Sequence, residues 1–317
     1  MSQPSHRALR TAVAIGASVA TLVACSAEQT RPGEPAGTGV HGGADGGIDP
    51  LIDGADAQRG VDTIELACAA ADHAGEAALR PFESLTARVV DLAGVAASGI
   101  SAQACGVNLC LYGTTEEDGT VSILQSQSLD RPAFKYGLGR DFIKVALPLP
   151  ADARLELGEQ RTARLPPASE GARWSIGGQT TSGDVTLTLA ADTRELDFDP
   201  FDFDSEQLRL FRAVGIPPDQ APDAVDASLG LELLYGMTPV DTELCPPARL
   251  EVPNEPGWPA GAAVEVFLHG VDVAERWAPY GGWAKVSDAA VSPDGAKIIT
   301  ADGGGLPVLG LVGMRRR

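Results

Sequence analysis

Positive charge is scarce in this sequence. Lys and Arg together number 24 against 43 Asp and Glu, so the formal net charge of the 317 residues is −19 at pH 7. The three arginines at 315–317 form a basic tip that is typical of a solvated chain end. So acidic a surface repels the phosphates of nucleic acids and anionic lipid headgroups. The sequence therefore argues against a nucleic-acid partner.

Long apolar runs are also missing. The run from Thr11 to Ala24 is shorter than the ~20 residues that a membrane-spanning helix needs. It follows a start that contains Arg7 and Arg10 and no acidic residue. A positive start and a short apolar region are typical of a secretory signal. We predict that residues 1–24 are a signal peptide.

The segment Leu22-Val23-Ala24-Cys25-Ser26 resembles the lipobox of bacterial lipoproteins. In that family the cysteine receives a diacylglyceryl group, the chain is cut before it, and the new N-terminus is acylated. The resemblance implies lipid attachment (diacylglyceryl and palmitate) at Cys25 and, with Ser rather than Asp next to it, an outer-membrane or cell-surface location. Two or more acyl chains make a stable anchor. The alternative is an ordinary secretory signal with an unrelated cysteine.

The next segments differ in composition. Residues 25–60 are dominated by Gly, Pro and Asp and offer little to bury, which predicts a disordered tether after the lipidated cysteine. From Val61 to Arg80, Ala, Leu and Glu dominate and Asp62 is a candidate N-cap, which predicts one short helix that ends before Pro81.

Histidine is rare, and the usual catalytic motifs are missing. There is no G-x-S-x-G, no H-E-x-x-H and no P-loop. Only His73 and His269 lie in sequence expected to fold, and we expect His269 to be a surface or turn residue. The glycines at 303–305 precede Pro307 and predict a turn. We therefore expect no enzyme, with a hydrolase of unrecognised site as one alternative.

Four cysteines remain beyond Cys25. An exported chain meets an oxidising environment, so an even number favours two disulfides. Cys105 and Cys110 are separated by only four residues and form the favoured pair, which leaves Cys68 with Cys245. The alternative, a zinc site, lacks a second close pair and a nearby histidine.

Glycine and proline are abundant, at 37 and 23 residues, and favour turns and short strands over helices. Alternating patterns and turn signals such as Asp118-Gly119 predict a mainly β fold of two sandwich-like domains, over residues 61–150 and 151–317. The predicted strands are Thr86–Asp91, Ile100–Cys105, Leu109–Tyr112, Thr120–Ile123, Phe142–Leu149, Val185–Leu189 and Leu229–Tyr235.

The first of these regions resembles the carboxypeptidase regulatory-like domain. The residues that carry the resemblance are Arg88-Val89-Val90-Asp91 with Gly94, Cys105-Gly106, Thr114-Thr115 and Asp118-Gly119. The resemblance implies a small transthyretin-like β-sandwich that is not itself catalytic.

The C-terminal part resembles a ZU5-like β-region of bacterial surface proteins. The matching segments are Pro247–Asn254, Gly261–Val266, Trp283–Val286 and Val291–Ile299, with a turn at Pro293-Asp294-Gly295. The resemblance implies a structural role or contact with a partner rather than an activity.

One acidic cluster is a candidate metal site. In an extended chain Asp197 and Asp199 share a face, as do Asp202 and Asp204, and Ca²⁺ prefers several carboxylate oxygens. Asp192 and Glu195 are further candidate ligands. The alternative is an amphipathic edge strand whose charged face discourages aggregation.

Aromatic residues form only 5% of the chain, yet three tryptophans and a tyrosine lie between residues 258 and 283. A loop that presents Tyr280 and Trp283 is a candidate sugar-binding site, and packing in the core is the alternative. Taken together, these patterns predict a non-enzymatic, lipid-anchored surface or envelope protein with a structural or partner-binding role and no cofactor other than the candidate calcium. The first alternative is a carbohydrate- or peptidoglycan-binding lipoprotein, whose partner would be an envelope glycan or surface protein.

Overall fold

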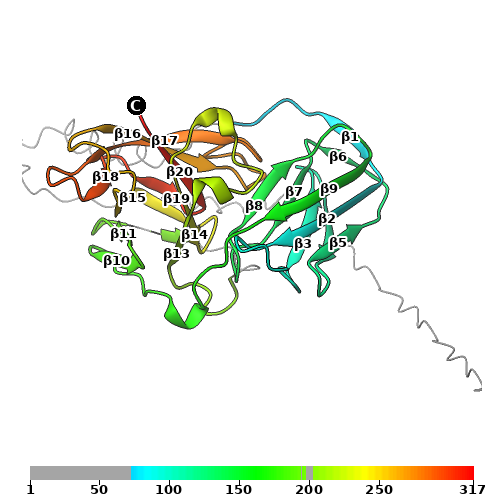
Figure 1. The fold of residues 1–317 in the computed structure, drawn as a ribbon, viewed down its shortest axis with the longest axis horizontal. Coiled ribbons are helices and arrows are strands. Elements are labelled where there is room, and N and C mark those ends of the chain that lie inside the picture. The colour runs from blue at the N-terminus through cyan, green and yellow to red at the C-terminus, as the bar shows by residue number, and fades with distance from the viewer. Residues whose placement is uncertain (1–72, 194, 198–202) are drawn as a thin grey trace, which may run out of the picture. The chain divides into compact units, whose positions relative to one another are not determined.

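The computed structural model describes residues 73–193, 195–197 (backbone only) and 203–317 (Figure 1). The predicted signal peptide, Cys25, the tether and Cys68 lie outside these residues. So does the predicted helix up to residue 72; the part from His73 to Ala78 contains no helix, and Leu79–Phe82 forms strand β1. None of the described helices is long and apolar enough to cross a membrane.

The prediction of a mainly β fold is confirmed. The described residues form twenty strands and three short 3-10 turns, η1 (Ala168–Glu170), η2 (Pro218–Gln220) and η3 (Ala227–Leu229). They divide into two β-regions within one compact unit.

The first β-region is a sandwich of a three-stranded and a four-stranded sheet (Figure 1). The three-stranded sheet has the order β5 (Thr120–Ile123), β2 (Ser84–Val90) and β9 (Arg154–Arg161). The four-stranded sheet has the order β4 (Cys110–Thr114), β3 (Ser101–Cys105), β7 (Ala133–Tyr136) and β8 (Val145–Pro148). Strands β1 (Leu79–Phe82) and β6 (Gln127–Asp130) form a separate antiparallel ribbon.

Alternation along the strands explains why the two sheets pack. On β2, Leu85, Ala87 and Val89 are buried, and they share one apolar core with Phe134 and Tyr136 of β7. Because successive side chains of a strand point to opposite faces, the intervening residues face outward. The buried faces of the two sheets thus form the interior of a β-sandwich.

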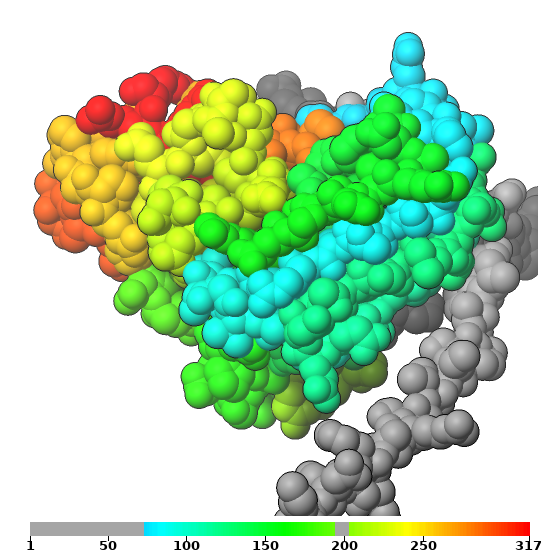
Figure 2. Space-filling model, turned by 45° about the vertical axis from the view of Figure 1, so that its right-hand side comes forward, coloured from blue at the N-terminus to red at the C-terminus, as the bar shows by residue number. Residues whose placement is uncertain are grey.

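Strand β9 completes this sandwich from residues beyond the first predicted domain. It pairs in parallel with β2, from Ser84 opposite Arg154 to Val90 opposite Arg161. Figure 2 shows it (green) alongside β2 (cyan) on the surface. The chain therefore contributes a strand to the first region after residue 150, before it enters the second.

The second β-region is one eleven-stranded sheet that bends around its own core. Its main path runs β10 (Gln179–Ser182), β11 (Val185–Thr188), β15 (Glu243–Pro253), β18 (Lys297–Thr300), β17 (Trp283–Val291), β16 (Ala263–His269), β20 (Leu311–Arg316), β14 (Leu233–Thr238) and β13 (Arg212–Ile216). Strands β12 (Glu195–Asp197) and β19 (Leu306–Val308) also pair with β15.

The ends of this long sheet approach each other. The backbone N–H of Ala213 on β13 donates to the hydroxyl of Ser182 on β10 at 3.0 Å, although the two strands share no ladder. The enclosed apolar core contains Leu187, Leu250 and Val266. The predicted turn at Pro293-Asp294-Gly295 connects β17 to β18, and Gly295 adopts φ +75° there, a conformation that suits glycine.

Candidate functional site

The second β-region covers half of the outer face of the four-stranded sheet. One row of residues crosses this face in register: Tyr112 opposite Gln103, Gln103 opposite Lys135, and Lys135 opposite Ala146. The end of the row at Ala146 is buried, whereas Tyr112 at the other end is 45% exposed. The covered end is a junction between the two regions, and the open end is a groove.

The covered end is held by a small apolar cluster. Its members are Cys105, Ala133 and Ala146 of the sandwich with Phe203, Val240, Val271 and Tyr280 of the second region. Because these residues come from separate parts of the chain, the cluster joins the two β-regions by the burial of apolar surface.

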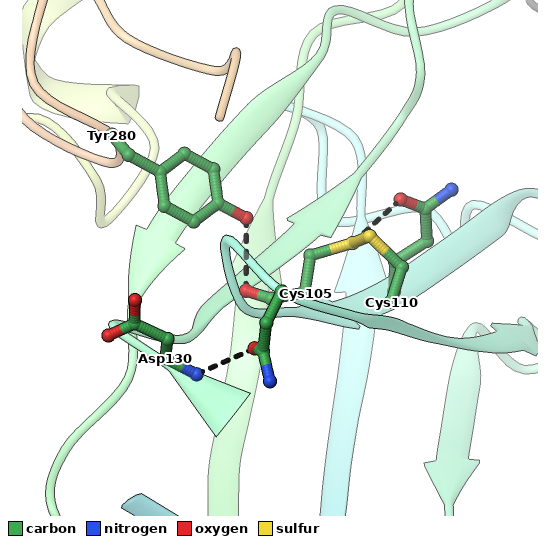
Figure 3. The surroundings of a disulfide bond; sticks show 6 residues. Cys105, Cys110, Asp130 and Tyr280 are labelled. Carbon is green, nitrogen blue, oxygen red and sulfur yellow. Dashed lines mark hydrogen bonds between the residues drawn. A yellow bond between two sulfur atoms is a disulfide. The ribbon is translucent and has the colours of Figure 1, made fainter. Parts of the chain in front are cut away.

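Tyr280 links this cluster to the disulfide-bonded hairpin (Figure 3). Its hydroxyl donates to the carbonyl of Cys105 at 3.0 Å, and the Nζ of Lys135 lies 5.1 Å from its ring centroid. Burial raises the pKa of Tyr280, so the phenol keeps its proton and remains a donor at neutral pH. Tyr280, a candidate sugar-binding residue, is only 9% exposed, in agreement with the alternative of core packing.

The structure contains the predicted disulfide between Cys105 and Cys110, which face each other across β3 and β4 (Figure 3). The hairpin turn is tied to its neighbour, because Asn108 Oδ1 accepts the backbone N–H of Asp130 at 2.8 Å. Cys245 is also disulfide-bonded. Its predicted partner, Cys68, lies outside the described residues, so that pairing stays a prediction.

Two ion pairs cross the junction with little exposure. Arg131 Nη1 donates to both carboxylate oxygens of Glu275 at 2.7 and 2.6 Å, and Glu275 is only 2% exposed. Burial by itself raises the pKa of Glu275, but the hydrogen bonds from Arg131 and from the Tyr280 N–H outweigh it and keep the pKa below its usual range. Lys144 pairs with Asp241 at 2.7 Å. Both pairs join the sandwich to the second region.

His269, at the end of β16, is a buried residue rather than the expected surface or turn histidine. The backbone N–H of Ala146 on edge strand β8 donates to Nε2 at 3.2 Å. The proton therefore lies on Nδ1, which donates to the carbonyl of Gly282 at 3.0 Å. Burial lowers the pKa of His269 to about 4, so the ring is neutral at pH 7. The imidazole satisfies a strand-edge donor that would otherwise be buried unpaired.

Trp283 also packs at the junction. Its ring centroid lies 5.0 Å from that of His269, and its Nε1–H donates to the carbonyl of Ala224 at 2.9 Å. The ring is half-buried against the core of the sandwich. As with Tyr280, these contacts agree with the packing alternative for this aromatic segment.

A small cavity lies beside His269 and measures about 30 Å³. Its four acidic lining residues have partners: Asp241 pairs with Lys144, Glu243 with Arg276 and Glu275 with Arg131, and Asp272 accepts the backbone N–H of Ala274. A space of this size holds about one water molecule. It is therefore too small for an organic ligand.

The groove at the open end of the sheet face is larger, at about 440 Å³. Ser101, Gln103 and Tyr112 form its floor on strands β3 and β4, and the turn at residues 137–141 forms one wall. Within the floor strands the apolar neighbours Ala102, Ala104 and Leu111 point into the sandwich core, which leaves the polar residues and the tyrosine ring on the outside. The groove thus combines an aromatic ring with polar side chains.

The second region contacts the turn that forms the wall of the groove. The hydroxyl of Thr238 on β14 donates to the carbonyl of Gly139 at 2.5 Å, and Arg212, opposite Thr238 on β13, is fully buried. At Gly137, with φ +86°, a Cβ would lie 1.9 Å from the carbonyl oxygen of Ile143, so only glycine fits. The turn that forms the wall is therefore held in place by specific contacts.

The predicted calcium cluster is only partly described. The side chain of Asp197 and the whole of Asp199 and Asp202 lie outside the described residues, and calcium binding there stays a prediction. Asp204 is exposed and Phe203 is fully buried, but neither residue lies in a strand, so the edge-strand alternative is not met at these two positions. Among the described side chains, no group of three or more His, Cys, Asp or Glu could hold a metal ion.

Comparisons with known proteins do not show a family for this chain. No family model matches the chain, and no curated protein matches it. One solved structure with a match is a DUF3823 family protein from Parabacteroides merdae, at 10% identity and a TM-score of 0.20, over 75% of this chain and 99% of that one. A likeness this distant carries no argument about fold or function.

Proposed function

We propose that this protein is a non-enzymatic, lipid-anchored protein of the outer membrane or cell surface that presents a rigid β-body to a partner. The observation that carries the proposal is the junction, where buried ion pairs, a buried imidazole and a buried tyrosine join the two β-regions. A body held in this way keeps the groove at Tyr112 in one shape, and pre-organised sites bind with less ordering cost.

The state of His269 supports a binding role over the hydrolase alternative. A general base must offer a free ring nitrogen to the nucleophile. Both ring nitrogens of His269 are already engaged, by the Ala146 N–H and the Gly282 carbonyl. Use of this ring as a base would break the contact between the two regions, so its role here is structural.

The lipobox resemblance supports the anchor, and the tether would hold the β-body away from the membrane. The test is the intact mass of detergent-extracted protein from the wild type and from Cys25→Ser. We expect the wild type to have the mass of residues 25–317 plus a diacylglyceryl group and an acyl chain. The Cys25→Ser variant should lose the lipid mass and leave the membrane fraction.

The double variant Cys105→Ser/Cys110→Ser is the matched control, because it removes cysteines far from the lipobox and should keep the lipid. Protease treatment of intact cells then reports whether the β-body faces outward. An uncut, unlipidated wild-type chain in the soluble fraction would contradict the anchor.

A further inference from the structure

We infer that the groove at Tyr112 is a binding site for a neutral saccharide. The inference rests on the proposed partner-binding function and adds the chemical class of the partner. Tyr280 and Trp283, the sugar-binding candidates of the sequence, pack at the junction between the two β-regions. The site inferred here lies instead on the open half of the outer face of the four-stranded sheet.

The aromatic ring of Tyr112 is the apolar part of the groove. Tyr112 is among the few large hydrophobic side chains in the described part of the chain that stay exposed, at 45%. It stands on a paired strand, directly opposite Gln103, so its position is set by the sheet. The apolar C–H face of a pyranose packs on such a ring while the sugar hydroxyls remain free to form hydrogen bonds.

Polar side chains form the rest of the groove lining. Ser101 and Gln103 on the floor supply a hydroxyl and an amide, and Asp141 on the wall supplies a carboxylate on an exposed residue. These groups include both donors and acceptors of hydrogen bonds, as the hydroxyls of a sugar require. An apolar peptide would offer the exposed carboxylate of Asp141 no hydrogen bond in place of its water.

Charge and size limit the class of ligand. The whole chain carries a formal charge of −19 and repels polyanions, and Asp141 adds a carboxylate to the wall of the groove. This negative charge favours a neutral saccharide over an acidic one. A volume of about 440 Å³ lies within the range of small-molecule sites.

The experiment is calorimetric titration of the detergent-extracted full-length protein with neutral hexasaccharides of glucose (α-1,4, β-1,4 and β-1,3), mannose and N-acetylglucosamine, and with an acidic oligogalacturonate. We expect saturable binding of at least one neutral sugar and none of the acidic one. Tyr112→Ala should weaken binding about tenfold or more, because it removes the stacking ring, and Tyr112→Phe should stay within about threefold. Asp141→Asn should weaken it about tenfold, because hydrogen bonds to an ionised acceptor are the stronger ones.

Leu124→Ala is the control, because Leu124 is 71% exposed and does not line the groove. Thermal unfolding of each variant verifies that the fold is kept. The inference is overturned if no neutral sugar binds, if only the acidic sugar binds, or if Tyr112→Ala and Asp141→Asn bind as the wild type does. A lipidated protein that binds no sugar would refute the saccharide site and leave the proposed lipid anchor intact. An unlipidated soluble protein that binds sugar through Tyr112 would refute only the lipid anchor.

Discussion

The outer face of the four-stranded sheet is divided between two environments. At one end Ala146 and Lys135 lie under the second β-region, with Tyr280 and His269 against them, and at the other end Tyr112 and Gln103 line an open groove. The residues alternate in the same way along both halves, yet one half packs against the second β-region and the other stays open. Whether the second β-region covers a side chain therefore matters more for its environment than the residue type does. Three measurements test this contrast.

The largest effect is expected from the buried ion pair. Glu275→Gln leaves Arg131 without its anionic partner at the covered end, and we expect the free energy of unfolding to fall by about 3 to 5 kcal/mol. Urea unfolding at pH 7 measures this. The matched control is Glu159→Gln in the Arg88–Glu159 pair, whose side chains are 41% and 44% exposed, where the loss should be under about 1 kcal/mol. Equal losses in the two variants would refute the distinction between buried and exposed pairs.

The second effect is a pH dependence that belongs to the junction. The imidazole of His269 has a pKa of about 4 when folded and about 6.5 when unfolded, so between these values the unfolded state binds more protons. Stability due to this group is therefore complete above pH 6.5 and falls as the pH decreases towards 4. We expect the wild type to lose about 2 to 3 kcal/mol more than His269→Gln over this range.

The measurement is urea unfolding of both proteins at pH 7, 6, 5 and 4. Carboxylates such as Glu275 lose stabilisation in acid in both proteins, so the difference between the two curves isolates His269. Parallel curves would show that the ring is not a buried neutral group.

The smallest effect compares Tyr280, which packs against the covered half of the face, with Tyr112 on its open half. Tyr280→Phe removes the hydroxyl that donates to Cys105, and we expect a loss of about 1 kcal/mol. Tyr112→Phe at the exposed end should change stability by less than about 0.5 kcal/mol. Thermal unfolding of the two variants measures the difference, and a larger loss for Tyr112→Phe would reverse the assignment of covered and open halves.

Much of the β structure was predictable because its signals are local. Thr120–Ile123 is a strand with the predicted bounds, and the turn signals Asp118-Gly119 and Pro293-Asp294-Gly295 lie between strands. The Cys105–Cys110 disulfide joins residues that a hairpin places opposite each other. Each of these features depends on neighbours within a few residues, and period-2 alternation and turn chemistry report on that range.

The candidate site was predicted less well because it depends on distant contacts. His269 is buried by Ala146, which is 123 residues away, and Tyr280 donates to Cys105, which is 175 residues away. The parallel pairing of β9 with β2 likewise has no local signature. The strand predicted at Leu109–Tyr112 did contain the signal for the groove, since Leu111 and Tyr112 must face opposite sides, but alternation does not say which outward face stays open.

The conformational preferences of nearby residues set the class of structure: short strands, tight turns and a hairpin disulfide can all be read from the sequence. Which outward-facing side chains are covered is a property of the folded molecule alone. Tyr280 and Tyr112 carry the same ring, and the packing of the two β-regions buries one and leaves the other exposed. The free energy of packing the two β-regions together comes from apolar area and paired charges that lie far apart in the chain, so no local pattern of residues reports it.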